Sequence, residues 1–338
     1  MKKKMTRAAL AAQIASIVGI IAIVAMIGFG LSACGGDDDG GGTHTHTYST
    51  TWSGSVTQHW KECTDASCDA TTETANHAPA DGVCTTCGYD NTPMFPMQMV
   101  DIPSGTLTWP NATITLSAFK MGKYEVTQEQ YEAVIGINPS DFSSNPAAGE
   151  TQGKRPVERV NWERALVFCN KLSILEGLTP AYSINESTNP DEWGTPNWNA
   201  VTVVSGSTGY RLPTEAQWEY ACRAGSTTDW YFGDDESELV NYAWYDANSN
   251  SRTHQVGLKL PNAFGLYDMH GNVMEWCWDG YGSLPTSNQT DYAAVSGSDR
   301  VVRGGNWAYS AEEARSSYRD GFFRNIPLEN MGFRVVRP

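Results

Sequence analysis

The sequence predicts an α+β protein that is rich in loops. Only 18% of its 338 residues are charged, while it holds 12 Trp, 15 Tyr and 32 Gly. This composition is typical of a loop-rich fold held together by aromatic side chains rather than of a helical bundle. Short stretches that alternate apolar and polar residues predict strands, and only three amphipathic stretches predict helices.

Residues 1–33 have the pattern of a secretory signal. A basic start, MKKKMTR, is followed by a long apolar run and by small residues that lead into Cys34. This arrangement resembles the lipobox of bacterial lipoproteins, in which Cys34 would become the lipidated first residue of the mature chain. A plain transmembrane anchor is the alternative, because the apolar run is nearly long enough to span a bilayer. Residues 34–48 are rich in Gly, Asp and Thr and predict a flexible tether.

A small cysteine-rich module is expected over residues 49–92. It is too short to bury enough apolar surface to fold alone, so we expect a crosslink. An exported protein meets oxidising conditions, which favours two disulfides. Two closely spaced pairs of cysteines, with histidines nearby, equally favour a zinc ribbon closed by four thiolates. Both alternatives give the module a structural role, and both use the same residues: Cys63, Cys68, Cys84 and Cys87.

Residues 93–338 are expected to form one domain, which begins with strands. Residues 98–109 and 112–127 alternate apolar and polar side chains, and a Pro-Asn pair separates them. This pattern predicts short strands joined by turns.

Three helices are expected next, over residues 127–136, 161–177 and 211–225. The first and third begin at the N-cap residues Thr127 and Thr214. The second has apolar residues at helical spacing on one face, and a glycine follows both the second and the third. Beyond residue 225 the pattern predicts loops and short strands with little helix.

Five motifs in this domain occur together in a specific order: MGKYEVTQEQY, RPVERVNWERALVFCNKLS, GYRLPTEAQWEYACRAG, AFGLYDMHGNVMEWCWDGY and RVVRGGNW…NMGFRVV. In sequence and spacing they resemble the formylglycine-generating-enzyme, or sulfatase-modifying-factor, superfamily over essentially all of residues 93–338. The resemblance implies an elaborated C-type lectin fold with little regular secondary structure. That expectation is compatible with the few helices and many short strands predicted from the sequence patterns.

The motif GLYDMHGNVMEW offers oxygen ligands for a hard cation. Two carboxylates flank a tight glycine loop whose backbone carbonyls would complete an oxygen cage. The resemblance implies a calcium ion here, with a role in holding the loop. A hydrogen-bonded turn without metal is the alternative. The matching positions are Asp268, Gly271, Val273 and Glu275.

The resemblance also locates the oxidative chemistry of the enzymes, which depends on a pair of thiols after the Gly-Gly. Those two positions fall at Tyr309 and Ala314 here, and no other side chain replaces a thiolate as nucleophile or copper ligand. We therefore predict that the protein is not an enzyme. The domain's own thiols, Cys169, Cys222 and Cys277, are expected to be small buried residues or to form a disulfide.

Residues 303–337, called the tail below, combine a Gly, Trp and Arg frame with positions rich in Tyr, Ser, Asn and Gly. These residue types are favoured in paratopes, and aromatic residues with Arg dominate interface hot spots. The tail also resembles the variable region of proteins diversified by diversity-generating retroelements, most closely those of treponemes. An ordinary Tyr-rich loop that packs against the domain is the alternative. The predicted ligand-binding positions are Asn306, Ala308, Tyr309, Ser310, Ser317, Tyr318, Asp320, Gly321, Phe322, Phe323, Asn325, Leu328 and Asn330.

The leading functional hypothesis is a non-enzymatic lipoprotein that displays the tail to bind varied targets. A formylglycine-generating-type oxidase and a structural envelope protein are the alternatives. We expect a monomer, an unknown protein or surface ligand as partner, and a lipid anchor in the bacterial cell envelope, on the exposed side of the outer membrane. The net charge of −15 argues against nucleic acid as a partner, because phosphate binding needs a basic footprint.

Overall fold

The computed structural model describes residues 97–294 and 297–338, together with the backbone of five short strands nearer the N-terminus. The chain divides between Asn76 and His77 into two compact units. The predicted signal segment, Cys34, the tether, and Cys63, Cys68 and Cys87 lie outside the described residues. The backbone of Cys84 belongs to a described strand, but the side chain of Cys84 lies outside the described part. The five strands are β1 (Ser53–Gly54), β2 (Gln58–Glu62), β3 (Thr71–Asn76), β4 (Pro79–Ala80) and β5 (Val83–Cys84).

From residue 97 onward, the C-terminal unit starts with two antiparallel pairs of strands. They confirm the strands predicted from the sequence. Each predicted segment contains two short strands, and pairing crosses between the segments. In each strand of the β7–β8 hairpin, buried residues alternate with more exposed ones, as the sequence pattern requires. The strands are β6 (Met99–Ile102), β7 (Gly105–Trp109), β8 (Ala112–Leu116) and β9 (Phe119–Gly122). The strand β17 (Val336–Arg337) pairs with the other edge of β9, so it belongs to the same sheet as β6.

The three predicted helices are confirmed as α2 (Gln128–Ile135), α3 (Trp162–Leu175) and α4 (Glu215–Arg223). Thr127 and Thr214 cap α2 and α4 through capping boxes, in which the N-cap hydroxyl accepts from the N3 amide. One helix end differs from expectation. Ala224, with φ 46°, is the first left-handed residue after α4, ahead of the glycine that the sequence suggested.

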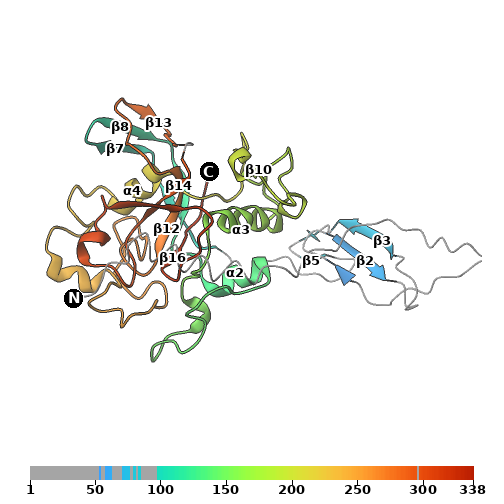
Figure 1. Ribbon diagram of the computed structural model, residues 1–338, viewed down its shortest axis with the longest axis horizontal. Coiled ribbons are helices and arrows are strands. Elements are labelled where there is room, and N and C mark those ends of the chain that lie inside the picture. The colour runs from blue at the N-terminus through green and yellow to red at the C-terminus, as the bar shows by residue number, and fades with distance from the viewer. Residues whose placement is uncertain are drawn as a thin grey trace, which may run out of the picture. The chain divides into compact units, whose positions relative to one another are not determined.

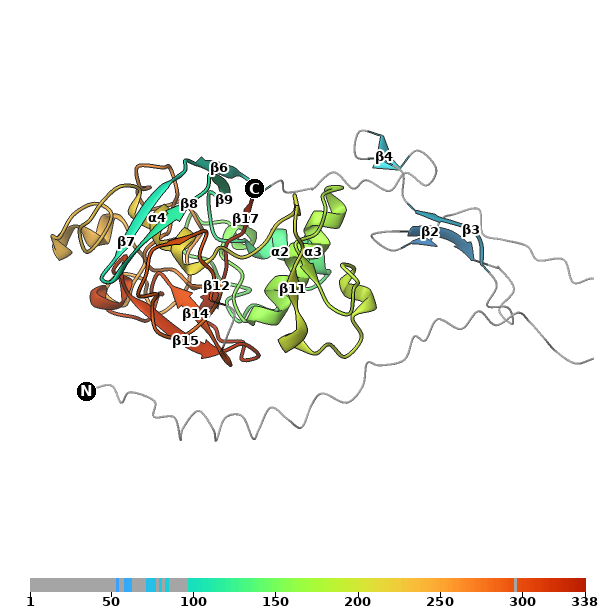
Figure 2. The same ribbon diagram turned by 90° about the horizontal axis from the view of Figure 1, so that it is seen from above.

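A four-stranded sheet in the order β15-β14-β12-β16 forms the centre of the C-terminal unit, and Figure 2 shows β12, β14 and β15 side by side. Strand β12 (Met274–Gly280) is buried along its whole length. It pairs with β14 (Asp299–Arg303), which in turn pairs with β15 (Arg319–Phe323) at the sheet edge, while β16 (Met331–Gly332) lies on the other side. Figure 1 shows β12 and β14 among loops and short helices.

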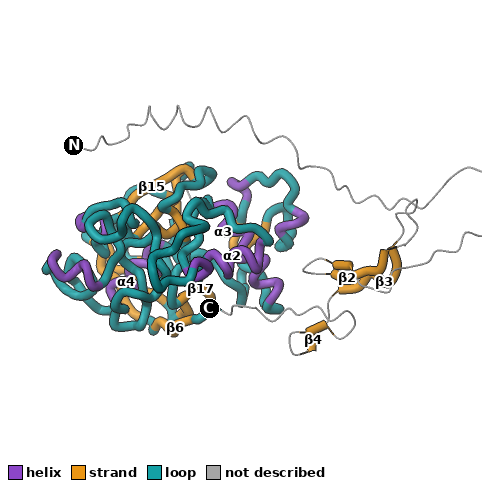
Figure 3. Tube along the Cα trace, turned by 90° about the horizontal axis from the view of Figure 1, so that it is seen from below, coloured by secondary structure: helices purple, strands orange, loops and turns teal. Residues whose placement is uncertain are grey.

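The remaining elements are short. They are the strands β10 (Tyr182–Ser183), β11 (Thr202–Val203) and β13 (Gln289–Thr290), and the 3₁₀ helices η1 (Gln152–Lys154), η2 (Pro190–Glu192), η3 (Trp198–Ala200), η4 (Glu236–Asn241) and η5 (Ala311–Ala314). Loops make up most of the described chain, as the teal tube in Figure 3 shows. The expected loop-rich α+β class is therefore confirmed.

Aromatic side chains hold these loops to the sheet. The Trp162 ring of α3 packs against Trp278 of β12 with centroids 5.3 Å apart, and Trp278 stacks on Tyr182 at 5.1 Å. The indole N–H of Trp162 donates to the Cys277 carbonyl at 3.0 Å, and that of Trp276 donates to the Val160 carbonyl at 2.8 Å. Each ring thus buries a large apolar area and also satisfies a polar group.

Packing beside the sheet is tight enough to test with a single methyl group. A Cβ added at Gly332 would come within 2.6 Å of the Val157 carbonyl oxygen and 2.8 Å of Val273 Cγ2. We predict that Gly332→Ala lowers the free energy of unfolding by about 1–3 kcal/mol through overpacking. Gly282→Ala is the matched control, because no atom lies within 4 Å of its added Cβ, and it should change stability by less than about 0.5 kcal/mol. Urea denaturation measures both, and equal effects would contradict the prediction.

Candidate functional site

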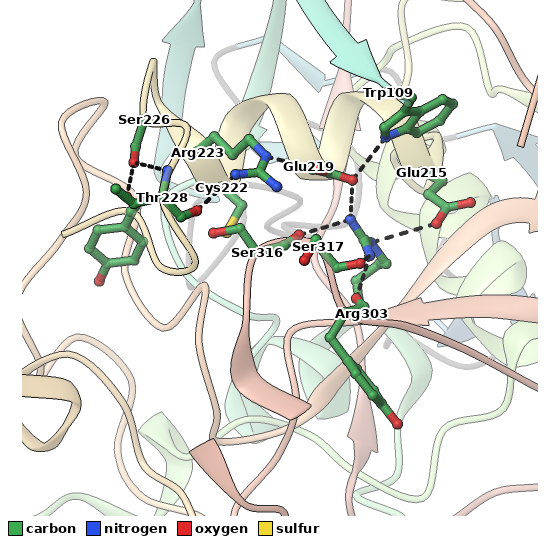
Figure 4. Close-up of polar contacts among 12 residues, drawn as sticks. Trp109, Glu215, Glu219, Cys222, Arg223, Ser226, Thr228, Arg303, Ser316 and Ser317 are labelled. Atoms are coloured by element: carbon green, nitrogen blue, oxygen red, sulfur yellow. Dashed lines mark hydrogen bonds and ion pairs between the residues drawn. The ribbon is translucent and has the colours of Figure 1, made fainter. Parts of the chain in front are cut away.

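The tail is attached to α4 by two pairs of oppositely charged groups. Glu215 and Glu219 stand one turn apart on α4 and are almost fully buried. Side chains four residues apart lie on the same face of a helix, so both carboxylates point toward the tail. Glu219 contacts Arg303 and Glu215 contacts Arg319. Figure 4 shows Arg303 between the helix and the tail.

Arg303 lies at the end of β14 and is fully buried. Its Nη2 is 2.5 Å from Glu219 Oε2 and donates to the Ser316 carbonyl at 2.9 Å. Its Nη1 donates to the carbonyls of Ser317, at 3.0 Å, and Tyr318. One side chain therefore fixes three consecutive carbonyl groups of the tail backbone, and its charge is balanced by a buried carboxylate.

Arg319, the first residue of β15, is held as firmly as Arg303. Its Nε and Nη2 both donate to the Glu215 carboxylate at 2.7 Å, and its Nη1 donates to the Gly282 carbonyl at 2.6 Å. A bidentate pair of this kind fixes the orientation of the guanidinium as well as its position. The backbone from residue 316 to residue 319 is thus tied down by two arginines.

The aromatic pair of the tail lies on a strand, whereas the sequence suggested a loop. Phe322 and Phe323 end β15, which pairs with β14 in the register Arg300 to Phe322 and Asp299 to Phe323. Phe322 is half-buried and packs against the main hydrophobic core, while Phe323 is 52% exposed. The Asp-Gly step is not a free turn either, because residues 320 and 321 belong to the same strand.

Tyrosines from two separate parts of the tail meet on this surface. Tyr309 precedes η5 and Tyr318 follows it, and both are half-buried against the core. Burial, followed by the carboxylates of Asp320 and Glu313, raises the pKa of Tyr309 to about 12. Burial, followed by Asp320 and Tyr309, also raises the pKa of Tyr318. Both phenols therefore stay protonated at neutral pH and remain hydrogen-bond donors.

Asn306 is the one predicted ligand-binding residue that the structure removes from the surface. It is fully buried, and its Oδ1 accepts the Ala308 amide at 2.8 Å, which shapes the turn after the Gly-Gly. The other predicted positions are half-exposed or exposed, and we refer to them together as the recognition surface. Its members are Ala308, Tyr309, Ser310, Ser317, Tyr318, Asp320, Gly321, Phe322, Phe323, Asn325, Leu328 and Asn330.

Two further arginines around this surface are paired with acids. Arg315 Nε lies 3.3 Å from Asp229 Oδ2, and Arg324 Nε lies 3.1 Å from Glu163 Oε1. Arg324 also donates to the Asn199 side chain at 2.6 Å, which attaches the segment around η3 to the tail. The charges of these arginines are thus neutralised locally, and the aromatic and small polar side chains are the groups left to contact a ligand.

The thiols of the domain are far from reactive. Cys169, Cys222 and Cys277 are free and fully buried, as expected for small core residues. Burial raises the pKa of Cys222 to about 12 and raises the pKa values of the other two as well. Because the thiolate is the reactive form, none of them has the environment of a nucleophile.

The predicted calcium ligands are already engaged in other contacts. Both carboxylate oxygens of Glu275 accept from the fully buried Arg334, at 2.7 and 2.6 Å, and one also accepts from the Trp218 indole at 2.7 Å. Asp268 Oδ2 accepts the Gly257 amide at 2.7 Å, which leaves only Oδ1 without a partner. A cation bound to Glu275 would have to displace a buried guanidinium.

In this arrangement Arg334 occupies Glu275, so the set Asp268, Gly271, Val273 and Glu275 offers calcium no open pair of carboxylates, although the buried Asp268 Oδ1 has no partner. Among the residues that the structure describes, no group of three or more His, Cys, Asp or Glu side chains is arranged to hold a metal ion. The alternative for this motif, a hydrogen-bonded turn, matches the contacts seen here.

Sequence reasoning missed the partners of the arginines. Glu215 and Glu219 were visible only as acids near the start of a helix, which favours them there without assigning a contact. Their spacing of four residues was the available signal. Tyr281 was missed altogether, although its ring lies 4.8 Å from the Arg319 guanidinium.

Fold and site together define a loop-rich α+β domain of the formylglycine-generating-enzyme type, in which buried arginines support an aromatic surface. Residues 88–338 match the family described as the sulfatase-modifying factor enzyme 1-like domain. The chain belongs to this family, and the resemblance expected from its motifs is confirmed.

Three similar proteins place the chain within that family. Treponema denticola variable protein 1 has a solved structure that is 42% identical, with a TM-score of 0.67, and the match covers 71% of this chain and 95% of that one. Chaperone protein LppX of Paenibacillus barcinonensis is 38% identical over 68% of this chain and 84% of its own length. The formylglycine-generating enzyme of Mus musculus is 26% identical over 72% of this chain and 76% of its own length.

The buried contact between Arg303 and α4 should contribute strongly to stability. Arg303→Met would leave three tail carbonyls without this donor and would remove the buried charge that pairs with Glu219 Oε2. We predict a loss of about 3–5 kcal/mol in the free energy of unfolding, as is typical when one partner of a buried pair is removed. Asp101→Asn is the control: it breaks the exposed pair of Asp101 with Lys120, and should cost less than about 1 kcal/mol. Losses of similar size in urea denaturation would show that Arg303 is not a structural centre.

Calcium should have no specific effect on this domain. Because Arg334 occupies the Glu275 carboxylate, we predict that the midpoint of thermal unfolding is the same in millimolar calcium as in the chelator EGTA. A ligand that binds only the folded state must raise that midpoint. Differential scanning fluorimetry checks this, with magnesium as the control ion. A rise seen with calcium alone would restore the calcium site expected from the sequence.

Proposed function

We propose that the chain is a non-enzymatic ligand-binding lipoprotein whose recognition surface contacts its targets. The observation that carries the proposal is the meeting of residues from both sides of η5 and from β15 on one aromatic surface with a fixed backbone. Tyr gives a large contact area at a low entropic cost, and Ser and Asn adapt their hydrogen bonds to a partner. Phe323 at 52% exposure is the kind of side chain that an interface would bury.

Diversification by a retroelement is the second part of the proposal. Its support is the likeness to Treponema denticola variable protein 1 and the residue types found at the surface positions. The half-buried members, Tyr309, Tyr318, Phe322 and Leu328, pack against the core, so exchange there would also change local packing. The exposed members, such as Ser310, Ser317 and Phe323, have no such constraint.

Anchoring through a lipid at Cys34, on the exposed side of the outer membrane, completes the proposal. It rests on the basic, apolar and small-residue order of residues 1–33. In the described ranges, none of the helices has the length and apolar character that crossing a membrane requires. The four cysteines of residues 63–87 are proposed to crosslink a structural module, through either disulfides or zinc.

Oxidase activity is the competing proposal, since the domain is similar to a formylglycine-generating enzyme. The resemblance puts the catalytic thiol pair at Tyr309 and Ala314. Tyr309 is half-buried and Ala314 is 1% exposed, so neither supplies a sulfur atom. The buried, protonated thiols of Cys169, Cys222 and Cys277 do not offer a substitute.

The diversification proposal predicts a pattern of differences among isolates. We expect copies of the gene to differ at surface positions such as Tyr309, Ser310, Tyr318, Phe323 and Asn330. The arginine and glycine frame should stay constant, because its contacts are buried. Sequencing the locus in several isolates measures this. Identical tails, with no neighbouring template copy and no reverse-transcriptase gene, would overturn the proposal.

A further inference from the structure

Tyr281 lies outside the tail but borders the recognition surface. It follows β12 directly, and its amide donates to the Asp299 carbonyl of β14 at 2.9 Å. It is 40% exposed, which is unusual for a large ring in this otherwise well-buried region. Burial is the main cause of the raised pKa of Tyr318, and the nearby Tyr281 phenol adds a smaller contribution in the same direction.

The Tyr281 ring lies directly on the backbone of Gly321. A Cβ added at Gly321 would approach Tyr281 Cγ to 2.3 Å and Cδ1 to 2.5 Å, closer than any real contact. Gly321 lies on β15 and has no left-handed backbone angle, so other residues could adopt its conformation. The Tyr281 side chain is what requires glycine here, because its Cβ would also lie 2.7 Å from the added atom. Any side chain at position 321 must therefore displace Tyr281.

Arg319 also contacts the Tyr281 ring. Its guanidinium carbon is 4.8 Å from the ring centroid, within the range of a cation–π contact. Arg319 is itself fixed by Glu215 and the Gly282 carbonyl. The ring is thus an exposed aromatic group on a rigid support, as is typical of interface hot spots made of Tyr and Arg.

We propose that Tyr281 is a fixed aromatic contact for a protein ligand at the recognition surface, and that the residue at position 321 sets the position of its ring. The inference rests on the proposed function and adds to it. A variable position would act through an unvarying side chain, so exchange at residue 321 would alter two contacts at once. A protein is the expected ligand because Tyr281 and Phe323 are exposed aromatic groups, while Arg315, Arg319 and Arg324 beside them are paired with acids and Arg300 is buried.

The test uses peptides selected from a phage-displayed library of random 12-residue sequences on the full chain. Peptides whose binding is lost in Phe323→Ala are kept, because they bind at the recognition surface. Tyr281→Ala should weaken these peptides by about tenfold or more, whereas Tyr281→Phe should retain most of the affinity. Gly321→Ala should weaken them too, because it displaces the ring. Leu258→Ala, at an exposed apolar residue of another segment, is the control and should leave binding unchanged.

Each outcome decides the inference. If folded Tyr281→Ala binds within about twofold of the wild type while Phe323→Ala does not bind, the role of Tyr281 is overturned and the proposed function stands. If Tyr281→Ala fails to fold, Gly321→Ala decides, since it retains the tyrosine, and unchanged binding would overturn the inference. If no selected peptide depends on Phe323, the proposed function fails, and the inference with it.

Discussion

The pair formed by Arg303 and Glu219 is the contact on which the tail depends. Buried pairs contribute little net stability compared with apolar residues, because desolvation offsets their attraction. What this pair provides is geometry, since the same guanidinium also fixes the carbonyls of residues 316 to 318. Glu219 is in turn held by the Trp109 indole at 2.9 Å and by Arg223 at 2.8 Å. The path of the tail is therefore set by backbone and frame contacts, which do not involve the surface side chains.

This division would let one backbone carry many surfaces, as the proposed function requires. Ser310, Ser317 and Phe323 are exposed, and their exchange leaves the arginine contacts intact. Tyr309 and Tyr318 also pack against the core, so smaller residues there would lose buried apolar area. Exchange at the exposed positions of the recognition surface would thus change contacts with a ligand. Exchange at the half-buried positions would also change packing against the domain.

The sequence predicted most of the local structure, but few of the contacts between distant strands and side chains. Helices α2, α3 and α4 follow from cap residues and apolar spacing, which act within a few residues. Strand β15 was missed because Asp320 and Gly321 have low strand propensity, and only pairing with β14 makes the strand. The burial of Asn306 and the Arg334 partner of Glu275 were missed for a related reason. Both depend on contacts between distant segments, which no local pattern encodes.

The position of β15 at a sheet edge suits an exchangeable surface. A residue in a central strand must fit neighbours on both sides, whereas an edge strand has only one, and β15 pairs with β14 alone. Its free edge would invite pairing with other chains, which proteins oppose with charges or short strands. Here β15 has five residues, and the Asp320 carboxylate accepts the Gly321 amide at 2.7 Å. The Gly321 amide thus has a partner within its own strand, and under the proposed function the side chains of β15 are the groups that contact a ligand.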